Sequence, residues 1–260
     1  MTVTASAPVG QLLRAWRERR RLSQLDLAIQ ADISTRHLSF VETGRSRPTP
    51  EMILRLTEQL DVPLRERNQL LLAGGYAPTY PQHGLDEPEL ASVRAALRQV
   101  LRGHEPYPAV VINRWWEVVD ANAMLGVLTR GCAAELLAPP VNVLRLSLHP
   151  GGLAPRIRNL GQWRAHLLEQ VHRRATRTGD ARLADLAEEL QGYPGNDVSA
   201  VAAPLDVVLP LVLEHDGRRL SLFSIEARVG TATDVTVDEL SIETFYPADA
   251  ETAEALRSSA

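Results

Sequence analysis

Hydrophobic residues recur at helical spacing in five short segments of the first 76 residues. Ser23 and Ser34 stand where helix N-caps belong, and Gly44 suits a left-handed C-cap. The predicted helices cover residues 10–21, 24–31, 35–43, 51–60 and 64–74. Because only a short turn joins the second helix to the third, we predict an all-α, five-helix domain that contains a helix-turn-helix.

The third predicted helix has two contrasting faces. Leu38 and Val41, with Ile33 just before the helix, point to one side and should join the core. The opposite side carries Arg36, Ser39, Phe40 and Thr43, with Thr35 at its edge. Such a face suits the DNA major groove, where Arg36 could grip a guanine through O6 and N7. Phe40 has two open interpretations, packing against a neighbouring element or contacting a thymine methyl group.

Four further residues are candidates for contacts with the DNA backbone. Gln24 opens the second helix, where peptide N–H groups and a side-chain amide can hold a phosphate together. Arg45 and Arg47 follow the third predicted helix, which we interpret as the recognition helix, in a loop, and His37 lies at its flank. Solvated side chains without a DNA role are the alternative for these residues. Glu42 lies near the core edge, and we expect it to pair with Arg17.

The remainder of the chain mixes strand and helix patterns. A helix over 87–102 is followed by two β-branched strands, a helix capped by Asn122, and a helical region over 161–192 with a break at 178–180. A hairpin turning at Asp216-Gly217 and one last alternating strand complete the pattern. The predicted strands cover residues 109–113, 115–121, 207–214, 220–229 and 239–246. We predict an α+β domain with a five-stranded antiparallel sheet.

The net charge of the chain changes sign at the same place where its composition changes. The net charge is −4, but residues 1–80 carry +3 and residues 81–260 carry −7. The change coincides with a Gly- and Pro-rich segment at 74–84, and charge asymmetry of this kind points to a nucleic-acid-binding module. The expected organisation is a disordered N-terminus (1–9), a helix-turn-helix domain (10–76), a linker (77–86) and a ligand-binding and dimerisation domain (87–257).

Residues 12–76 resemble the xenobiotic-response-element type of helix-turn-helix, which includes the lambda-type phage repressors. The resemblance is carried by Leu22-Ser23-Gln24, Leu27-Ala28, Ile33-Ser34, Leu38-Ser39 and Glu42-x-Gly44-Arg45. It implies a lambda-repressor-like fold and DNA binding, with Gln24 contacting the DNA backbone and positions 35, 36 and 40 reading base edges. Phe40 stands where this family often has a polar residue.

Residues 87–257 resemble the ligand-binding domain of MmyB-like transcription regulators. The resemblance is carried by Pro108-Ala109-Val110-Val111, Trp116-Glu117-Val118-Val119, Asn122, Asp234-Val235-Thr236, Asp238-Glu239-Leu240, Ile242-Glu243 and Phe245-Tyr246-Pro247-Ala248-Asp249. It implies a PAS-like fold and, for some members, a fatty-acid-like or other apolar ligand.

Bulky residues in this second domain could line an apolar cavity. The candidates are Trp115, Trp116, Leu125, Leu144, Trp163, Leu211 and Phe223, with Arg145 or His149 for a polar head group. Filling of an ordinary core is the alternative interpretation.

Other kinds of chemistry find no support in the sequence. No G-x-S-x-G, P-loop, G-x-G-x-x-G or H-E-x-x-H motif is present, so we expect no enzyme activity, no cofactor and no metal. No run approaches the ~18 apolar residues that span a bilayer, and we expect a cytoplasmic protein. We therefore predict a homodimeric, one-component transcriptional regulator whose binding to a DNA operator responds to a small apolar ligand. In the alternative, the C-terminal domain serves only dimerisation or binding of a protein partner.

Overall fold

The computed structural model describes residues 7–195 and 208–259 and divides the chain into two compact units. Unit 1 contains residues up to His83 together with Thr176–Gly179 and Thr231–Asp238. Unit 2 contains Gly84–Ala175, Asp180–Gly230 and the chain from Glu239 onward. Most of the predicted disordered N-terminus, residues 1–6, lies outside the described residues. The functional domain boundaries given above stay a prediction.

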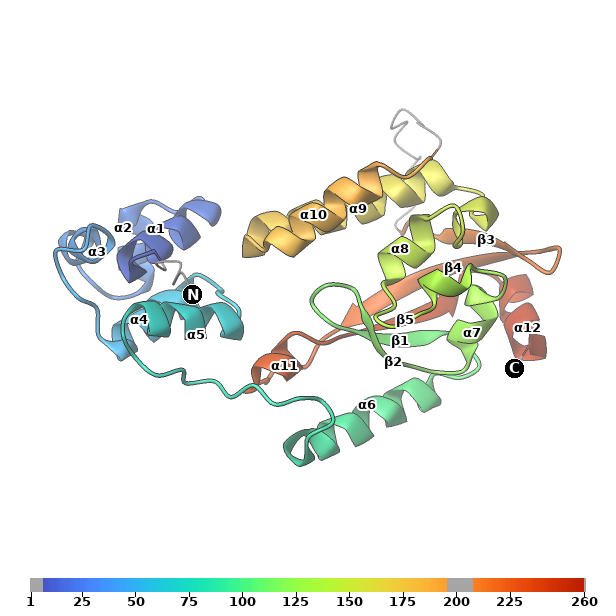
Figure 1. Ribbon diagram of the computed structural model, residues 1–260, viewed down its shortest axis with the longest axis horizontal. Helices are drawn as coiled ribbons and strands as arrows, with labels where there is room; N and C mark the ends of the chain where they lie inside the picture. Colours follow the sequence, from blue (N-terminus) through green and yellow to red (C-terminus); the bar gives the residue numbers. More distant parts are fainter. Residues whose placement is uncertain (1–6, 196–207, 260) are drawn as a thin grey trace. The chain divides into compact units, whose positions relative to one another are not determined.

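Unit 1 begins with five helices, which appear in blue to cyan in Figure 1. Local signals in the sequence set their ends: Ser23 and Asp26 form a reciprocal capping box, and the Ser34 hydroxyl accepts a hydrogen bond from the His37 backbone N–H. Gly44 has φ +73°, the conformation expected of it just after a helix. The helices are α1 (Val9–Arg19), α2 (Gln24–Gln30), α3 (Thr35–Glu42), α4 (Pro50–Gln59) and α5 (Leu64–Ala73).

One hydrophobic core joins these five helices. Leu13 of α1, Leu27 of α2, Leu38 of α3, Ile53 of α4 and Leu70 of α5 are all at most 1% exposed. Each helix therefore contributes an apolar stripe to the same interior, which fixes α3 to the rest of the unit.

Unit 2 is built on one five-stranded antiparallel sheet with the order β2-β1-β5-β4-β3. The Asp216-Gly217 turn, with φ +48° and +73°, joins β3 to β4 as predicted. The strands are β1 (Ala109–Ile112), β2 (Val118–Ala121), β3 (Leu211–His215), β4 (Arg218–Ala227) and β5 (Ser241–Pro247). This arrangement confirms the predicted α+β, PAS-like fold class.

Helices cover both faces of the sheet in unit 2 (Figure 1). On one face, α7–α10 enclose the larger core with Val110, Ile112 and Leu213. On the other face, α6 packs on Ala109 and Val111. Helix α12 packs on β4 and β5, and its Ala255 and Leu256 belong to the larger core. The bounds are α6 (Ala91–Gly103), α7 (Met124–Thr129), α8 (Val143–Leu148), α9 (Leu160–Thr178), α10 (Ala181–Gln191) and α12 (Ala250–Ser259), with short 3₁₀ turns at Pro88–Leu90, Ala134–Leu136 and Ala154–Arg156.

The prediction that Asn122 caps the following helix is wrong. The N-cap of α7 is Ala123, and no side chain caps it. The Asn122 side chain instead accepts a hydrogen bond from Ala109 N (3.1 Å) and donates to the carbonyls of Leu101 and Tyr107. Asn122 is 7% exposed, so its amide satisfies buried backbone groups where α6 meets β1.

Three elements are absent from the sequence prediction, namely α8, α11 (Val235–Asp238) and α12. The segment that contains α11 connects β4 to β5, yet it groups with unit 1. Asp238 Oδ2 accepts a hydrogen bond from the Leu64 backbone N–H at the start of α5 (3.1 Å), and Asp234 Oδ2 is paired with His83 Nδ1 (2.8 Å). We call Thr231–Asp238 the return segment, because it brings the chain back to unit 1 between two strands of unit 2.

Candidate functional site

Helix α3 presents a polar face to solvent, as its sequence predicts. Leu38 and Val41 are buried, at 0% and 1% exposure. Arg36 and Thr43 are exposed, whereas Thr35, His37 and Ser39 are partly exposed. No residue of the predicted base-reading set lies under protein in unit 1, so the face is sterically open to a DNA groove.

Phe40 takes neither a core position nor a fully exposed one. Its ring is partly exposed and lies near two arginines: the guanidinium carbon of Arg36 lies 5.4 Å from the ring centroid and that of Arg45 lies 5.9 Å from it. These separations are within the range of cation–π attraction. Phe40 therefore lies beside two positive side chains, one on α3 and one in the loop that follows it, an arrangement that the sequence pattern did not reveal.

A buried carboxylate attaches α3 to α1 and α2. Glu42 is 4% exposed and accepts hydrogen bonds from Arg17 Nε (2.7 Å) and Nη2 (2.9 Å). The second carboxylate oxygen also accepts from Gln24 Nε2 (2.8 Å). The expected Arg17–Glu42 pair is thus confirmed, and its hydrogen bond raises the pKa of Arg17. Gln24, at the start of α2, is held in a fixed position beside α3.

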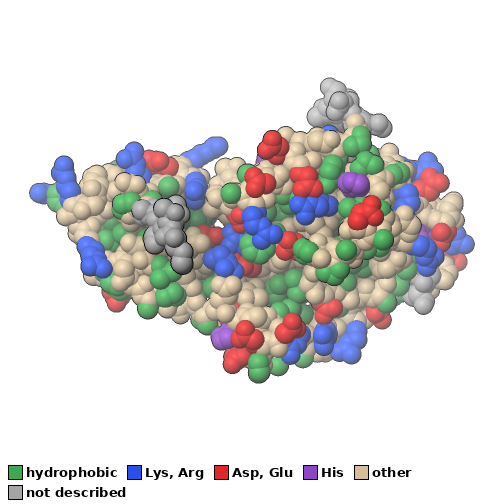
Figure 2. Space-filling view, in the orientation of Figure 1, with side chains coloured by type: hydrophobic (Ala, Val, Ile, Leu, Met, Phe, Trp, Pro, Cys, Tyr) green, Lys and Arg blue, Asp and Glu red, His purple; other side chains and the backbone are tan. Residues whose placement is uncertain are grey.

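The other backbone-contact candidates differ in how they are held. Arg47 donates a hydrogen bond to the Gly74 carbonyl (2.8 Å), and its guanidinium carbon lies 5.2 Å from the Tyr76 ring centroid. Arg47 is therefore tied to the end of α5, although part of it stays exposed. Arg45 is exposed next to Phe40. Figure 2 shows arginine side chains projecting from several places on this part of the molecule.

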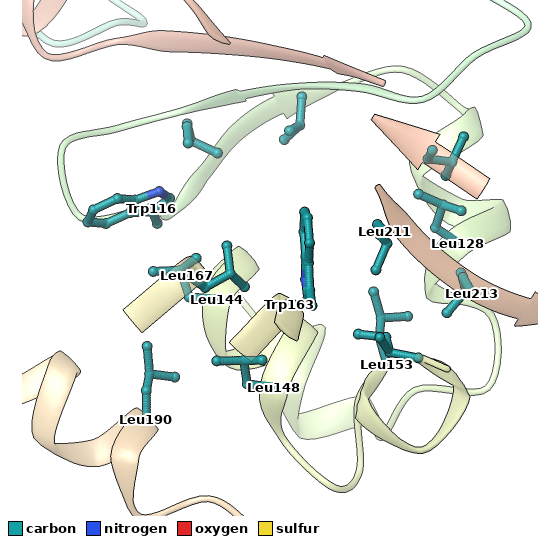
Figure 3. Packing of buried hydrophobic residues seen from close by; sticks show 14 of the residues in the cluster. Trp116, Leu128, Leu144, Leu148, Leu153, Trp163, Leu167, Leu190, Leu211 and Leu213 are labelled. Atoms are coloured by element: carbon teal, nitrogen blue, oxygen red, sulfur yellow. The ribbon is translucent and has the colours of Figure 1, made fainter. Parts of the chain in front are cut away.

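In unit 2, a cavity of about 60 Å³ lies between the sheet and α7, α8 and α9. Four of the predicted ligand residues line it together: Leu125, Leu144, Trp163 and Leu211. Figure 3 shows the Trp163 ring standing between the strands and the helix that carries Leu144 and Leu148. Trp163 is held in this orientation because its Nε1 donates a hydrogen bond to Ser147 Oγ (2.9 Å), another lining residue.

The other five candidates do not line this cavity, namely Trp115, Trp116, Arg145, His149 and Phe223. Trp116 is 4% exposed, and the guanidinium carbon of Arg174 lies 3.8 Å from its ring centroid. Arg145 forms a two-bond ion pair with Glu189 (2.8 and 2.7 Å), and this hydrogen bonding raises the pKa of Arg145. Phe223 stacks on Tyr246, its partner across β4 and β5, at 5.4 Å between ring centroids.

Sequence reasoning missed the polar residues that line the cavity, namely Thr129, Ser147 and Glu243. For Glu243, the sequence signal that could have revealed its position is the alternation of side-chain direction along β5. Residues two apart share a face of a strand, so Glu243 and Phe245 belong to one face, and both line the cavity.

None of the helices in the described parts of the chain combines the length and the apolar character that a membrane crossing requires.

An open recognition helix in one unit and a lined cavity in the other define a DNA-binding transcription regulator with a ligand-binding domain. Residues 93–258 match the family model described as the MmyB-like transcription regulator ligand binding domain, and residues 8–70 match a helix-turn-helix domain. The chain therefore belongs to the MmyB-like transcription regulators, as its sequence resemblance predicts. The description of the matched family is that of a transcription regulator.

Two individual similarities accompany the family match. The chain is 31% identical over 112 residues to an uncharacterized HTH-type transcriptional regulator, RghRB, of Bacillus subtilis (strain 168), covering 42% of this chain and 78% of that protein. It is also similar to the structure of an RNA-binding Light-Oxygen-Voltage receptor, with 16% identity and a TM-score of 0.27, over 96% of this chain and 61% of that one. A TM-score this low does not bear on the fold.

We expect Arg36→Ala to weaken discrimination at one base position of the operator by about 1–3 kcal/mol, because a guanine would lose its two hydrogen bonds. Competition binding with operators changed one base pair at a time measures this loss. Arg55→Ala, which removes an exposed arginine on α4, is the control and should leave base preference unchanged. An unaltered preference at every position in the Arg36 variant would remove this role.

We expect Glu42→Gln to lower the free energy of unfolding of the full chain by about 3–5 kcal/mol, because the buried Arg17 would lose its hydrogen-bonded counter-charge and keep only the exposed Glu18, 3.8 Å away. Urea unfolding followed by circular dichroism measures the change. Glu58→Gln, on the exposed side of α4, should stay within about 0.5 kcal/mol of the unmodified protein. Equal stability of the two variants would contradict a structural role for Glu42.

Proposed function

We propose that this protein is a one-component regulator whose operator binding is changed by a small apolar molecule held in the cavity of unit 2. The observation that carries the proposal is the apolar cavity, within a chain whose other unit leaves its recognition helix open. Thr35, Arg36, Ser39 and Phe40 are the proposed base-reading residues. The proposed contacts with DNA phosphates come from Gln24, His37, Arg45 and Arg47, and such contacts weaken with salt.

The chemistry of the cavity wall supports an apolar ligand. Leucine, valine and aromatic side chains make up most of the lining, and an apolar wall favours an apolar occupant. The volume of about 60 Å³ is smaller than the ~150 Å³ cavity that admits benzene. An aliphatic ligand must therefore displace side chains of α7, α8 or α9. A ligand that binds only a displaced arrangement supplies the differential affinity that a switch requires.

The return segment offers a covalent route from the cavity to unit 1. It lies in the connection between β4 and β5, the strand that carries Glu243 and Phe245. Within unit 1, its Asp238 binds the first backbone N–H of α5. A shift of β5 caused by a ligand would pull on this attachment, and a coupling of about 1–3 kcal/mol would be ordinary for allostery.

We propose in addition that the protein acts as a homodimer, because one recognition helix reads too few base pairs to specify an operator. Two copies predict a pseudo-palindromic site whose half-sites lie about 34–36 Å apart, or a multiple of that distance. Operator selection and analytical ultracentrifugation of the complex measure the symmetry and the stoichiometry. A single, asymmetric half-site bound by one copy would contradict the dimer.

We expect Val143→Phe, a partly buried cavity residue on α8, to abolish the response to ligand while leaving operator binding itself intact, because the larger ring occupies the cavity. The measurement is operator affinity with and without small molecules extracted from the native cells. The unmodified protein should respond by about 5–150-fold. Val100→Phe on the exposed side of α6 is the matched control and should respond like the unmodified protein.

Two outcomes would count against the ligand. If no extract changes operator affinity of the unmodified protein, and native mass spectrometry finds no retained small molecule, the C-terminal domain serves dimerisation or a protein partner instead. If Val143→Phe responds as fully as the Val100→Phe control, the cavity is not the place where the ligand acts.

A further inference from the structure

One ionisable side chain stands in the wall of the apolar cavity. Among the described residues that line it, Glu243 alone carries an ionisable group. The two other polar lining residues are already engaged: Ser147 Oγ accepts the indole N–H of Trp163, and Thr129 Oγ1 donates to the Gly126 carbonyl (3.4 Å). The Glu243 carboxyl is thus the strongest polar feature that a ligand would meet.

The register of the sheet explains how a glutamate comes to lie there. Glu243 is in the central strand β5, between Val110 of β1 and Glu226 of β4. Cross-strand partners share a face of the sheet, and Val110 and Phe245 of this face also line the cavity. An apolar residue would pack at this position without cost, so a partly buried carboxyl group in the cavity wall is informative.

The surroundings disfavour a negative charge on Glu243. Burial raises the pKa of its carboxyl group, and the neighbouring Glu226 raises it further, while a hydrogen bond with Ser224 and the charge of Arg174 act in the opposite direction. Arg174 is itself committed to Glu226, at 3.3 Å, and to the face of Trp116. The site therefore has little capacity to neutralise a second anion.

We propose that Glu243 selects an apolar ligand that ends in a hydroxyl group and discriminates against one that ends in a carboxylate. This inference rests on the proposed function, since it concerns the ligand of the same cavity. A hydroxyl can donate to an ionised carboxyl and accept from a protonated one, so it is satisfied in either state. A carboxylate can only accept, and its charge would lie beside Glu243 and Glu226 in apolar surroundings.

The test compares two ligands that differ only in the polar end, 1-decanol and decanoate, with 1-hexanol and hexanoate as a shorter pair. Calorimetric titration of the full chain measures their affinities. The unmodified protein should prefer each alcohol by about tenfold or more. Glu243→Gln, which removes the charge and adds an N–H donor for a carboxylate, should bring the preference close to unity. Glu254→Gln, at an exposed position of α12, should retain the original preference.

Each outcome separates the inference from the function on which it rests. If both members of a pair bind the unmodified protein equally well, or the preference survives Glu243→Gln, the role of Glu243 is overturned and the apolar-ligand function stands. If none of the four compounds binds, the apolar-ligand function fails and the inference fails with it. The preference of the unmodified protein tests the inference even if the variant does not fold. An equal effect of Glu254→Gln would also overturn it, because the cavity would not be responsible.

Discussion

The buried carboxylate of Glu42 is the interaction on which the DNA-binding half depends. It is the last residue of α3, and it accepts hydrogen bonds from Arg17 of α1 and from Gln24 of α2. Apolar packing alone would let a short helix turn about its own axis by a few degrees at small cost, since dispersion contacts are not directional. A charged acceptor with donors from two other helices fixes that rotation. Because the Glu42 side chain is fixed towards the interior, Arg36 and Phe40 on the other side of α3 point outward.

Local rules explain most of what the sequence predicted correctly. Ser23, Ser34 and Gly44 act through their own backbone neighbourhoods, and Asp216-Gly217 adopts the conformation that a tight hairpin needs, so each could be identified without knowledge of the fold. Arg17 and Glu42 are 25 positions apart in the chain. Their pairing could still be predicted, because each residue lies near the apolar stripe of a regular helix. The base-reading role of the α3 residues stays a prediction.

The second unit shows where such reasoning stops. Asn122 looks like a helix cap from its neighbours, yet it binds three backbone groups that only the folded sheet and α6 bring together. Leu144, Leu211 and Phe223 are equivalent in sequence terms, but strand register turns Leu211 to the cavity and Phe223 towards Tyr246. Alternation along β5 places Glu243 on the same face as Phe245, but only the helices packed on that face show that it meets a cavity. Whether a side chain points into a cavity depends on the strand register and on which face of the sheet the helices cover. Neither can be predicted from the sequence of one strand or helix alone.

The return segment has a consequence for how such regulators can diversify. A regulator can acquire a new sensor domain by one recombination event in its linker only if each domain is encoded entirely on one side of the recombination point. Here, a break in the linker would separate His83 and Leu64 from the carboxylates of Asp234 and Asp238, which lie about 150 positions or more further along the chain. A transplanted sensor would have to bring a return segment that fits its new host. New ligand specificities should therefore arise more readily by mutation of the residues around the cavity than by replacement of the whole sensor domain.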